Sequence, residues 1–501
     1  MTDPRISLGQ RFLPDEGAPV LDALDGVRPV IKVGPAVGDL GAVACGALYS
    51  MLIRLYPHTA VDGEALLGTN PWGAGRLSDL PARLARSIPV PTRDPDHDLA
   101  IAIGTEIGAA DLWMGGDDWT ARLGRSPQTV GGRSLGLGLQ AAAALAAAEV
   151  MKLVLGPFGM INVPSGGELV WNLANYQLSE APTLVVPALR PVVALWLGAG
   201  SVGSSVAGVA GCVADLRGSA DVVDPDNFDP ARNPYRYPAA LGTGEGPKAD
   251  WVGDLLKQAG WSARPFVSRV GDWVRSQPEP GFPGVAVSSV DRVDGRLQVA
   301  DVMAATTLSV GVDGLALHLQ REQLADNWAC SYCDYVSLDP PMGQVQVIAN
   351  LVGLPVHRVA RLYLDGEPLV QADLEQAVAA GRVRPDRIAE LAGRRIDDLI
   401  RRAYAEATVA LPGAGTASVS APFVSWMCGV LVVAELVKAA VGAPLVDRRV
   451  DLDMSGVPLG VIRKRPRDNT GHCTCESPWR KRWAATLYKQ WHQTKLGCWP
   501  A

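Results

Sequence analysis

The sequence has little excess of either charge sign and no long apolar run free of polar residues. Its 501 residues include 46 Lys and Arg against 52 Asp and Glu, a net charge of −6. This slight acidity argues against nucleic acid as a partner. The most apolar stretch, residues 135–155, contains Gln140, Glu149 and Lys152, so we expect a buried core helix and no membrane association. No signal sequence is recognisable at the N-terminus, and we expect a cytoplasmic protein.

Three glycines follow a β-branched apolar run in the middle of the chain. The segment that begins at Val192 reads VVALWLGAGSVGSSVAG, and it places Gly198, Gly200 and Gly203 between an expected strand and a helix of small residues. A second apolar run ends at Asp224. In such a strand–turn–helix–strand–acid unit, backbone N–H groups bind phosphate and the acid binds ribose hydroxyls. The segment therefore predicts a nucleotide site in an α/β domain.

The polar residues after Asp224 favour a triphosphate over a dehydrogenase cofactor. Asn233, Arg236 and Lys248 lie in a Pro- and Gly-rich segment. Arginine can bind phosphate oxygens in a fork, and lysine supplies a point charge. Asp313 ends the apolar run LSVGV, where an acid would suit Mg²⁺ that bridges to phosphate. Taken singly, Arg236 and Lys248 could be solvated loop residues, and Asp313 could be a helix cap. An NAD-dependent oxidoreductase therefore stays open as an alternative function.

In this order, the residues resemble the adenylating domain of the ThiF/MoeB/ubiquitin-activating enzyme family over about residues 190–335 and 420–476. That family uses ATP to convert a C-terminal carboxylate, usually of a ubiquitin-like protein, into an acyl-adenylate and pyrophosphate. The resemblance implies that ATP is bound by Gly198, Gly200, Gly203, Asp224, Asn233, Arg236 and Lys248, that Asp313 holds Mg²⁺, and that Arg236, Lys248 and Asp313 are catalytic. It also implies an arginine supplied by a partner domain, for which Arg11 is the candidate and Arg5 the alternative.

Four of the eight cysteines form two close pairs, Cys330 with Cys333 and Cys473 with Cys475. Two pairs far apart in sequence are typical of a structural zinc site that joins two segments. The family also carries two cysteine pairs at these places. The second pair is CxC here and CxxC in the family, which leaves His472 as an alternative ligand. The other interpretation is a set of reduced thiols.

The first part of the chain repeats the second without its phosphate-binding residues. The correspondences are Gly34 and Gly38 with the glycine turn, Asp62 with Asp224, Asn70, Pro71 and Trp72 with Asn233, Pro234 and Tyr235, and Glu149 and Lys152 with Glu435 and Lys438. The run LAIAIGTEIGA, from Leu99, is matched with LSVGVDGLAL, which puts Thr105 or Glu106 near the place of Asp313. Gly73 stands where the second copy has Arg236, and the first copy has no evident lysine and no cysteine pairs.

We therefore predict two Rossmann-like, ThiF-type adenylation domains in an internal pseudo-dimer. Residues 1–185 form the inactive domain and residues 186–501 the active one, with a helical insertion at about 340–412 and a basic, Trp-rich tail at about 477–501. The insertion contains no cysteine, although ubiquitin-activating enzymes carry their thioester cysteine in this region. Whether a residue of this chain carries the acyl group covalently stays open. The candidates for such a residue are Cys45, Cys212, Cys428, Cys498, Thr416, Ser418 and Ser420.

The resemblance implies an enzyme that adenylates a ubiquitin-like protein with ATP, Mg²⁺ and a structural Zn²⁺. The high content of Ala, Gly and Arg favours a bacterial source. Transfer to a conjugating-type enzyme is an open further step. The alternatives are a ThiF-like enzyme that adenylates a peptide or sulfur-carrier protein in a biosynthetic pathway, and a nucleotide-binding scaffold without turnover. We predict that Asp313→Ala abolishes ATP–pyrophosphate exchange and leaves the fold intact.

Overall fold

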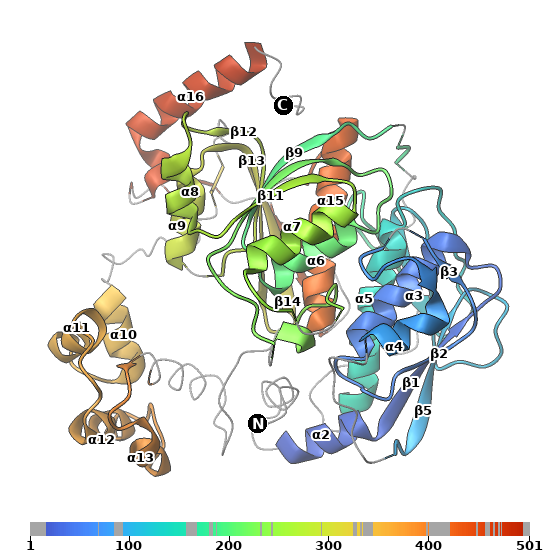
Figure 1. Ribbon diagram of the computed structural model, residues 1–501, viewed down its shortest axis with the longest axis horizontal. Helices are drawn as coiled ribbons and strands as arrows, with labels where there is room; N and C mark the ends of the chain where they lie inside the picture. Colours follow the sequence, from blue (N-terminus) through green and yellow to red (C-terminus); the bar gives the residue numbers. More distant parts are fainter. Residues whose placement is uncertain are drawn as a thin grey trace. The chain divides into compact units, whose positions relative to one another are not determined.

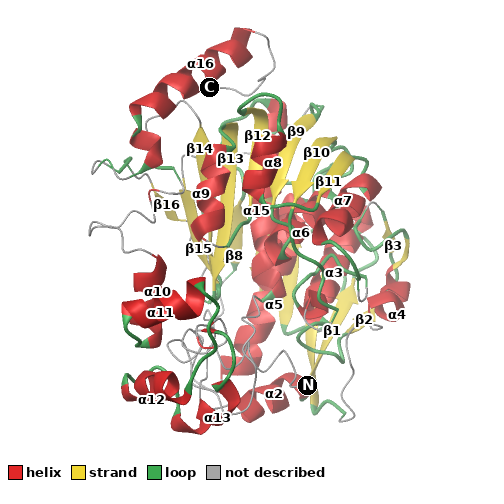
Figure 2. Ribbon diagram, turned by 60° about the vertical axis from the view of Figure 1, so that its left-hand side comes forward, coloured by secondary structure: helices red, strands yellow, loops and turns green. Residues whose placement is uncertain are grey.

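The computed structural model divides into two compact units, Asp22–Tyr335 with Ser420–Ala501, and Met1–Leu21 with Val336–Val419. Figures 1 and 2 show their helices and strands. The residues described are 17–68, 70–84, 94–156, 168–179, 184–186, 188–230, 233–241, 244–291, 293–323, 328–330, 333, 344–396, 399, 421–446, 449–455, 461–463, 466–468, 471 and 473–493. The predicted boundary between residues 185 and 186 stays a prediction.

The larger unit contains an eight-stranded mixed sheet in the order β11-β10-β9-β12-β13-β14-β15-β16. We call this sheet and its helices the C-terminal lobe. The five strands β9 to β13 are parallel, and β13 to β16 pair antiparallel. Numbered along the chain, the parallel strands follow the order 3-2-1-4-5 of a doubly wound nucleotide-binding fold. Their bounds are β9 (Val192–Leu197), β10 (Gly218–Val223), β11 (Ser262–Phe266), β12 (Phe282–Ser288), β13 (Ala304–Asp313), β14 (Ala316–Gln323), β15 (Arg449–Asp453) and β16 (Val461–Arg463).

Helices cover both faces of this sheet, as right-handed crossovers require. Helices α8 and α9 pack through Val270, Trp273 and Val299 on Leu195 and Leu197 of β9. Helix α6 contacts α7 and α15. The helices of this lobe are α6 (Ser201–Ala210), α7 (Lys248–Gln258), α8 (Val270–Ser276), α9 (Val293–Asp301), α15 (Pro422–Val441) and α16 (Pro478–Gln493), with short 3₁₀ turns at Asn233–Tyr235 and Thr474–Glu476.

The same unit contains a six-stranded sheet in the order β2-β1-β5-β6-β7-β8, which we call the N-terminal lobe together with its helices. Strands β2, β1, β5 and β6 are parallel, and β6, β7 and β8 are antiparallel. This repeats the order and directions of β10-β9-β12-β13-β14-β15, so the α/β fold and the repeat are confirmed. The elements are α2 (Gly17–Asp25), β1 (Val27–Val33), α3 (Gly38–Leu52), β2 (Ala60–Asp62), β3 (Leu66–Leu67), β4 (Gly75–Arg76), a 3₁₀ turn (Leu77–Asp79), α4 (Leu80–Leu84), β5 (His97–Ile103), β6 (Leu112–Gly116), β7 (Thr120–Gly124), α5 (Leu137–Leu155) and β8 (Leu169–Asn172).

Strand pairing corrects one correspondence between the two lobes. Strand β5, which contains the run from Leu99, pairs with β1 as β12 pairs with β9. The run therefore matches β12, and the match with LSVGVDGLAL was wrong. The counterpart of β13 is β6, so Asp117, directly after β6, stands where the C-terminal lobe has Asp313. Thr105 and Glu106 follow β5 and do not occupy that place.

The two long apolar helices, α5 and α15, contact each other. Each carries a buried ion pair three residues apart, Lys152 with Glu149 and Lys438 with Glu435. Both helices are long and apolar enough to span a membrane by length and composition, but 94% of each apolar window is buried in the protein. The prediction of a core helix at residues 135–155 is confirmed for α5. Figure 1 shows α5 in cyan and α15 in orange.

The smaller unit is helical where it is described. It contains α10 (Gln344–Val352), α11 (Val356–Leu364), α12 (Gln371–Ala379), a 3₁₀ turn (Pro385–Arg387) and α13 (Ile388–Leu391). Its own apolar core includes Val352, Leu362 and Leu374. Arg358 binds both carboxylate oxygens of Asp373 at 2.8 Å, which ties α11 to α12. These helices lie within the predicted insertion, whose limits stay predictions.

Candidate active site

The glycine turn between β9 and α6 has a separate reason for each glycine. Gly198 has φ +95°, which favours glycine. A Cβ on Gly203 would lie 2.0 Å from the carbonyl oxygen of Gly198, so this glycine lets α6 approach the strand. A Cβ on Gly200, at the start of α6, would meet nothing within 4 Å. The N-terminus of α6 is therefore open to an anion, as phosphate binding requires.

Asp224 follows β10 and ties it to this turn. Its carboxylate accepts hydrogen bonds from the N–H groups of Ala199, at 2.6 Å, and Asp226, at 2.8 Å. Burial raises the pKa of Asp224, while these hydrogen bonds and the charge of Lys248 oppose the shift. The residue lies beside the glycine turn, which is the position that a ribose-binding acid takes in nucleotide-binding folds of this strand order.

Arg236 belongs to a folded segment, residues 233–240, that packs against α6. Its N–H donates to the carbonyl of Asn233 at 2.9 Å, and its own carbonyl accepts a hydrogen bond from Ser201 of α6. The Asn233 side chain accepts the N–H of Asp229 at 2.5 Å, so Asn233 shapes the loop in this structure. The Nε atom of Arg236 is buried and has no hydrogen-bond partner among the described residues. An unsatisfied buried donor of this kind is available to an anionic ligand.

Lys248 is the first residue of α7 and faces the same region. Its Nζ lies 2.9 Å from a carboxylate oxygen of Asp226, and its side chain is 14% exposed. A phosphate would compete with Asp226 for this lysine. Burial raises the pKa of Tyr237, with smaller contributions from Asp224, Asp226 and Asp291 and an opposing one from Arg236. The two cations and three acids therefore act on one region.

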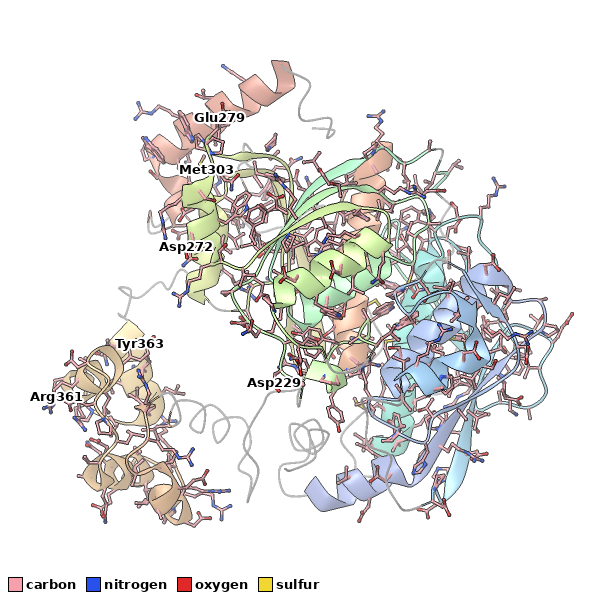
Figure 3. All side chains as sticks on the ribbon, viewed as in Figure 1. Asp229, Asp272, Glu279, Met303, Arg361 and Tyr363 are labelled. Carbon is pink, nitrogen blue, oxygen red and sulfur yellow. The ribbon has the colours of Figure 1, made fainter. Side chains whose placement is uncertain are left out.

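Asp291 is an acid that the sequence prediction missed. It follows β12, the strand next to β9, and Ser289 before it donates a hydrogen bond to the carbonyl of Gly198 at 3.1 Å. Asp313 ends β13, two strands away from β9, and only its backbone is described. The signal for Asp291 was present in the apolar run GVAVSSV followed by an acid. Asp229, which is labelled in Figure 3, precedes the segment that contains Arg236.

Apolar side chains border the equivalent turn of the N-terminal lobe, although a Cβ on Gly38, at the start of α3, would meet nothing within 4 Å. Val37 is 6% exposed, and its Cγ1 would lie 3.3 Å from a Cβ on Gly104. The side chain of Ile107 would lie 3.6 Å from a Cβ on Gly34. The two lobes therefore differ in the apolar neighbours of Gly34 and Gly104, and the sequence comparison places Gly73 where the C-terminal lobe has Arg236.

Four cysteines come together beside the C-terminal lobe sheet, and all their sulfurs lie within 4.8 Å of one another. The Sγ atom of Cys473 lies 3.4 Å from that of Cys330 and 3.5 Å from that of Cys333, and Cys333 is 3.5 Å from Cys475. A tetrahedral Zn²⁺ with bonds of about 2.3 Å separates its sulfur ligands by about 3.8 Å, so the cluster fits this ion. Hydrogen bonds from the other three thiols lower the pKa of Cys333.

The other described cysteines are core residues. Cys45, Cys212 and Cys428 are buried, and burial raises the pKa of each thiol. Cys428 lies in the second turn of α15 rather than at its N-terminus, so the helix dipole does not activate it. Low reactivity is expected for all three. The predicted candidates outside the described residues are Arg5, Arg11, Thr416, Ser418, Ser420, His472 and Cys498.

No protein-family model matches the sequence. It is similar to the uncharacterized protein y4jF of Sinorhizobium fredii (strain NBRC 101917 / NGR234), with 24% identity over 451 residues, 85% of this chain and 84% of that protein. Among solved structures, E. coli MccB is similar with 14% identity and a TM-score of 0.35, over 58% of this chain and 66% of that chain. The structure of E. coli MccB with MccA-N7isoASN is similar with 12% identity and a TM-score of 0.32, over 58% of this chain and 68% of that chain. The similarity to y4jF thus extends beyond either lobe alone.

Proposed function

We propose that the C-terminal lobe binds MgATP and adenylates a carboxylate. A carboxylate oxygen forms a bond to the α-phosphorus while the bond from that phosphorus to the bridging oxygen breaks, giving an acyl-adenylate and magnesium pyrophosphate. The observation that carries the proposal is the open turn at Gly200 with the buried Nε of Arg236 nearby, which no described residue binds. Arg236 and Lys248 would stabilise phosphate charge, and Asp224 would bind the ribose.

For the substrate, we propose the C-terminal carboxylate of a ubiquitin-like protein. The acyl group of the adenylate then bonds directly to a nucleophile of a conjugating-type partner, while its bond to the phosphate oxygen breaks and AMP leaves. Thioester formation on this chain needs an accessible thiol of low pKa. In the part of the chain that the structure describes, Cys45, Cys212 and Cys428 are buried with raised pKa, and the other cysteines belong to the four-sulfur cluster. Direct transfer is consistent with this distribution.

An ATP–pyrophosphate exchange assay tests the function. Exchange of labelled pyrophosphate into ATP that requires a small glycine-ended protein supports the proposal. Exchange that instead requires a short peptide or a sulfur-carrier protein assigns the second substrate class. Nucleotide binding without exchange toward any of these acceptors identifies a scaffold and contradicts adenylation.

Two glycine variants distinguish a glycine needed for the phosphate to approach the turn from a glycine needed for folding. Gly200→Ala is expected to fold normally, because the added Cβ meets only open space, and to weaken MgATP binding about ten-fold or more by crowding the phosphate. Gly203→Ala is expected to destabilise the lobe, because its Cβ would clash with the carbonyl of Gly198. Thermal unfolding and nucleotide titration measure the two effects. Equal loss of stability in both variants contradicts this division.

Two aspartate variants locate the magnesium ligand. We propose Asp291 for this role because β12 borders β9, whereas β13 does not. Asp291→Ala is expected to lower exchange about 10³-fold, on the scale of lost transition-state charge stabilisation, and Asp313→Ala by less than about 3-fold. The opposite ranking would restore the sequence-based assignment of Asp313. Unchanged unfolding temperatures in both variants are the control.

A further inference from the structure

The N-terminal lobe buries an arginine against the segment that carries Arg236. Arg54 lies just beyond α3 and is 1% exposed. Its guanidinium donates to the carbonyl of Ala240 at 2.8 Å and to the hydroxyl of Ser50 at 2.9 Å. Ala240 is four residues after Arg236 and belongs to the other lobe. The contact therefore joins the lobes at the end of the candidate phosphate-binding segment.

Two more side chains of the N-terminal lobe hold the same short stretch. The hydroxyl of Ser50 and the indole N–H of Trp72 both donate to the carbonyl of Pro238, the latter at 2.9 Å. Trp72 also stacks on Trp426 of α15, with ring centroids 5.6 Å apart, which fixes its indole. With Ser201 bound to the carbonyl of Arg236, hydrogen bonds hold the main chain on both sides of Tyr237.

Arg54 is an expensive residue to bury for structural purposes alone. Among the described residues no carboxylate pairs with it, and its Nε is buried without a hydrogen-bond partner. Burial lowers the pKa of Arg54 to about 9. An unpaired buried cation destabilises a fold, and an apolar residue of similar volume would avoid that cost. The polar side chains of the N-terminal lobe at this place, Ser50, Arg54 and Trp72, bind the carbonyls of Pro238 and Ala240.

We propose that Arg54 is a positioning residue by which the N-terminal lobe aligns Arg236 for the phosphates of ATP. This inference rests on the proposed nucleotide site and extends it across the lobe boundary. Arg54 acts through the main chain of residues 238–240 and touches no substrate. An N-terminal lobe that has Gly73 where the sequence comparison expects an arginine would then retain a function, since it pre-organises the site of its neighbour.

The test is a double-mutant cycle on MgATP affinity. Arg54→Met is expected to weaken MgATP binding about ten-fold, because the segment loses charge-assisted hydrogen bonds. In the Arg236→Ala background, the same substitution is expected to change affinity by less than about two-fold, because residues that act through one contact are not additive. Effects that multiply would show that Arg54 supports only the fold and would overturn the inference.

Hydrogen exchange gives a readout that does not need the reaction. The amides of Arg236, Tyr237 and Ala240 are hydrogen-bonded within the segment, and they are expected to exchange faster in Arg54→Met. The matched control is Arg76→Met, since Arg76 is a 64% exposed arginine of the same lobe that pairs with Glu64. It should alter neither affinity nor exchange. Unchanged exchange at residues 236–240 in Arg54→Met would overturn the inference.

Milder variants keep the test decisive if Arg54→Met fails to fold. Arg54→Lys keeps the charge with fewer donors, and Trp72→Phe removes one N–H donor while keeping a ring. Each is expected to weaken MgATP binding about three-fold, with the same non-additivity toward Arg236→Ala. A wild-type chain that binds no nucleotide overturns the proposed function and this inference together. A wild-type chain that binds ATP, with wild-type affinity in these variants, overturns this inference alone.

Discussion

Replacing Arg236 with alanine is expected to lower ATP–pyrophosphate exchange by about 10²- to 10³-fold, the usual cost of losing one preorganised charge-stabilising donor. Among the described residues the buried Nε of Arg236 has no hydrogen-bond partner, so its hydrogen-bonding capacity is available to the phosphates. The unfolding temperature is expected to stay near the wild-type value, because removal of an unsatisfied buried donor relieves a cost to the folded state. Exchange kinetics and a thermal scan measure the two quantities.

The matched control for this variant is Arg275→Ala in the same lobe. Arg275 is 75% exposed and pairs with Asp272 on the surface of α8. Its loss is expected to leave exchange unchanged, since exposed ion pairs contribute little. Equal losses in the two variants would mean that net charge rather than position matters. Full exchange in Arg236→Ala would remove this residue from the mechanism.

Loss of zinc is expected to lower the unfolding temperature of the C-terminal lobe by about 10 °C. Structural Zn²⁺ contributes roughly 10–16 kcal/mol in small sites, and even a third of that corresponds to about 10 °C at 2–4 °C per kcal/mol. The cluster joins Cys330, beyond β14, to the segment that leads into α16. Helix α16 packs through Ala484 and Leu487 on Met303. Zinc loss should therefore release α16 first.

Elemental analysis and a chelator titration test this expectation. One zinc per chain is expected in the wild type and none in Cys333→Ala, which should unfold at the temperature of the chelated wild type. Cys45→Ala is the control, because Cys45 is buried in α3 away from the cluster and should leave the zinc content at one. A purified chain without zinc, or full zinc in Cys333→Ala, would refute the site.

Local chemistry made part of the site predictable. Gly198 and Gly203 indicate a turn because each meets a local backbone requirement, and Gly200 between them leaves the start of α6 open. The two cysteine pairs predict a metal site because two closely spaced pairs of thiols can bind one ion. The structure brings all four sulfurs together. The α/β repeat was also readable, since both copies carry the same succession of apolar runs and glycines.

Non-local pairing made the rest unpredictable. The apolar runs before Asp291 and Asp313 look alike, and only the sheet order shows that the first of them borders β9. The same ambiguity produced the wrong match for the run from Leu99. Arg54 carries no sequence signal at all, because a single arginine after an apolar helix is usually solvated, and its burial depends on the other lobe.

The aromatic contacts between the lobes limit how this protein can be dissected. Trp72 stacks on Trp426, and the hydroxyl of Tyr176 donates to Glu435 of the other lobe at 2.5 Å. Cutting the chain between residues 184 and 191 would expose on each half the apolar face that now packs against the other lobe. It would also expose one side of the Glu435–Lys438 ion pair to water. Such halves are prone to aggregate, so point substitutions in the intact chain are the practical way to assign a role to each half.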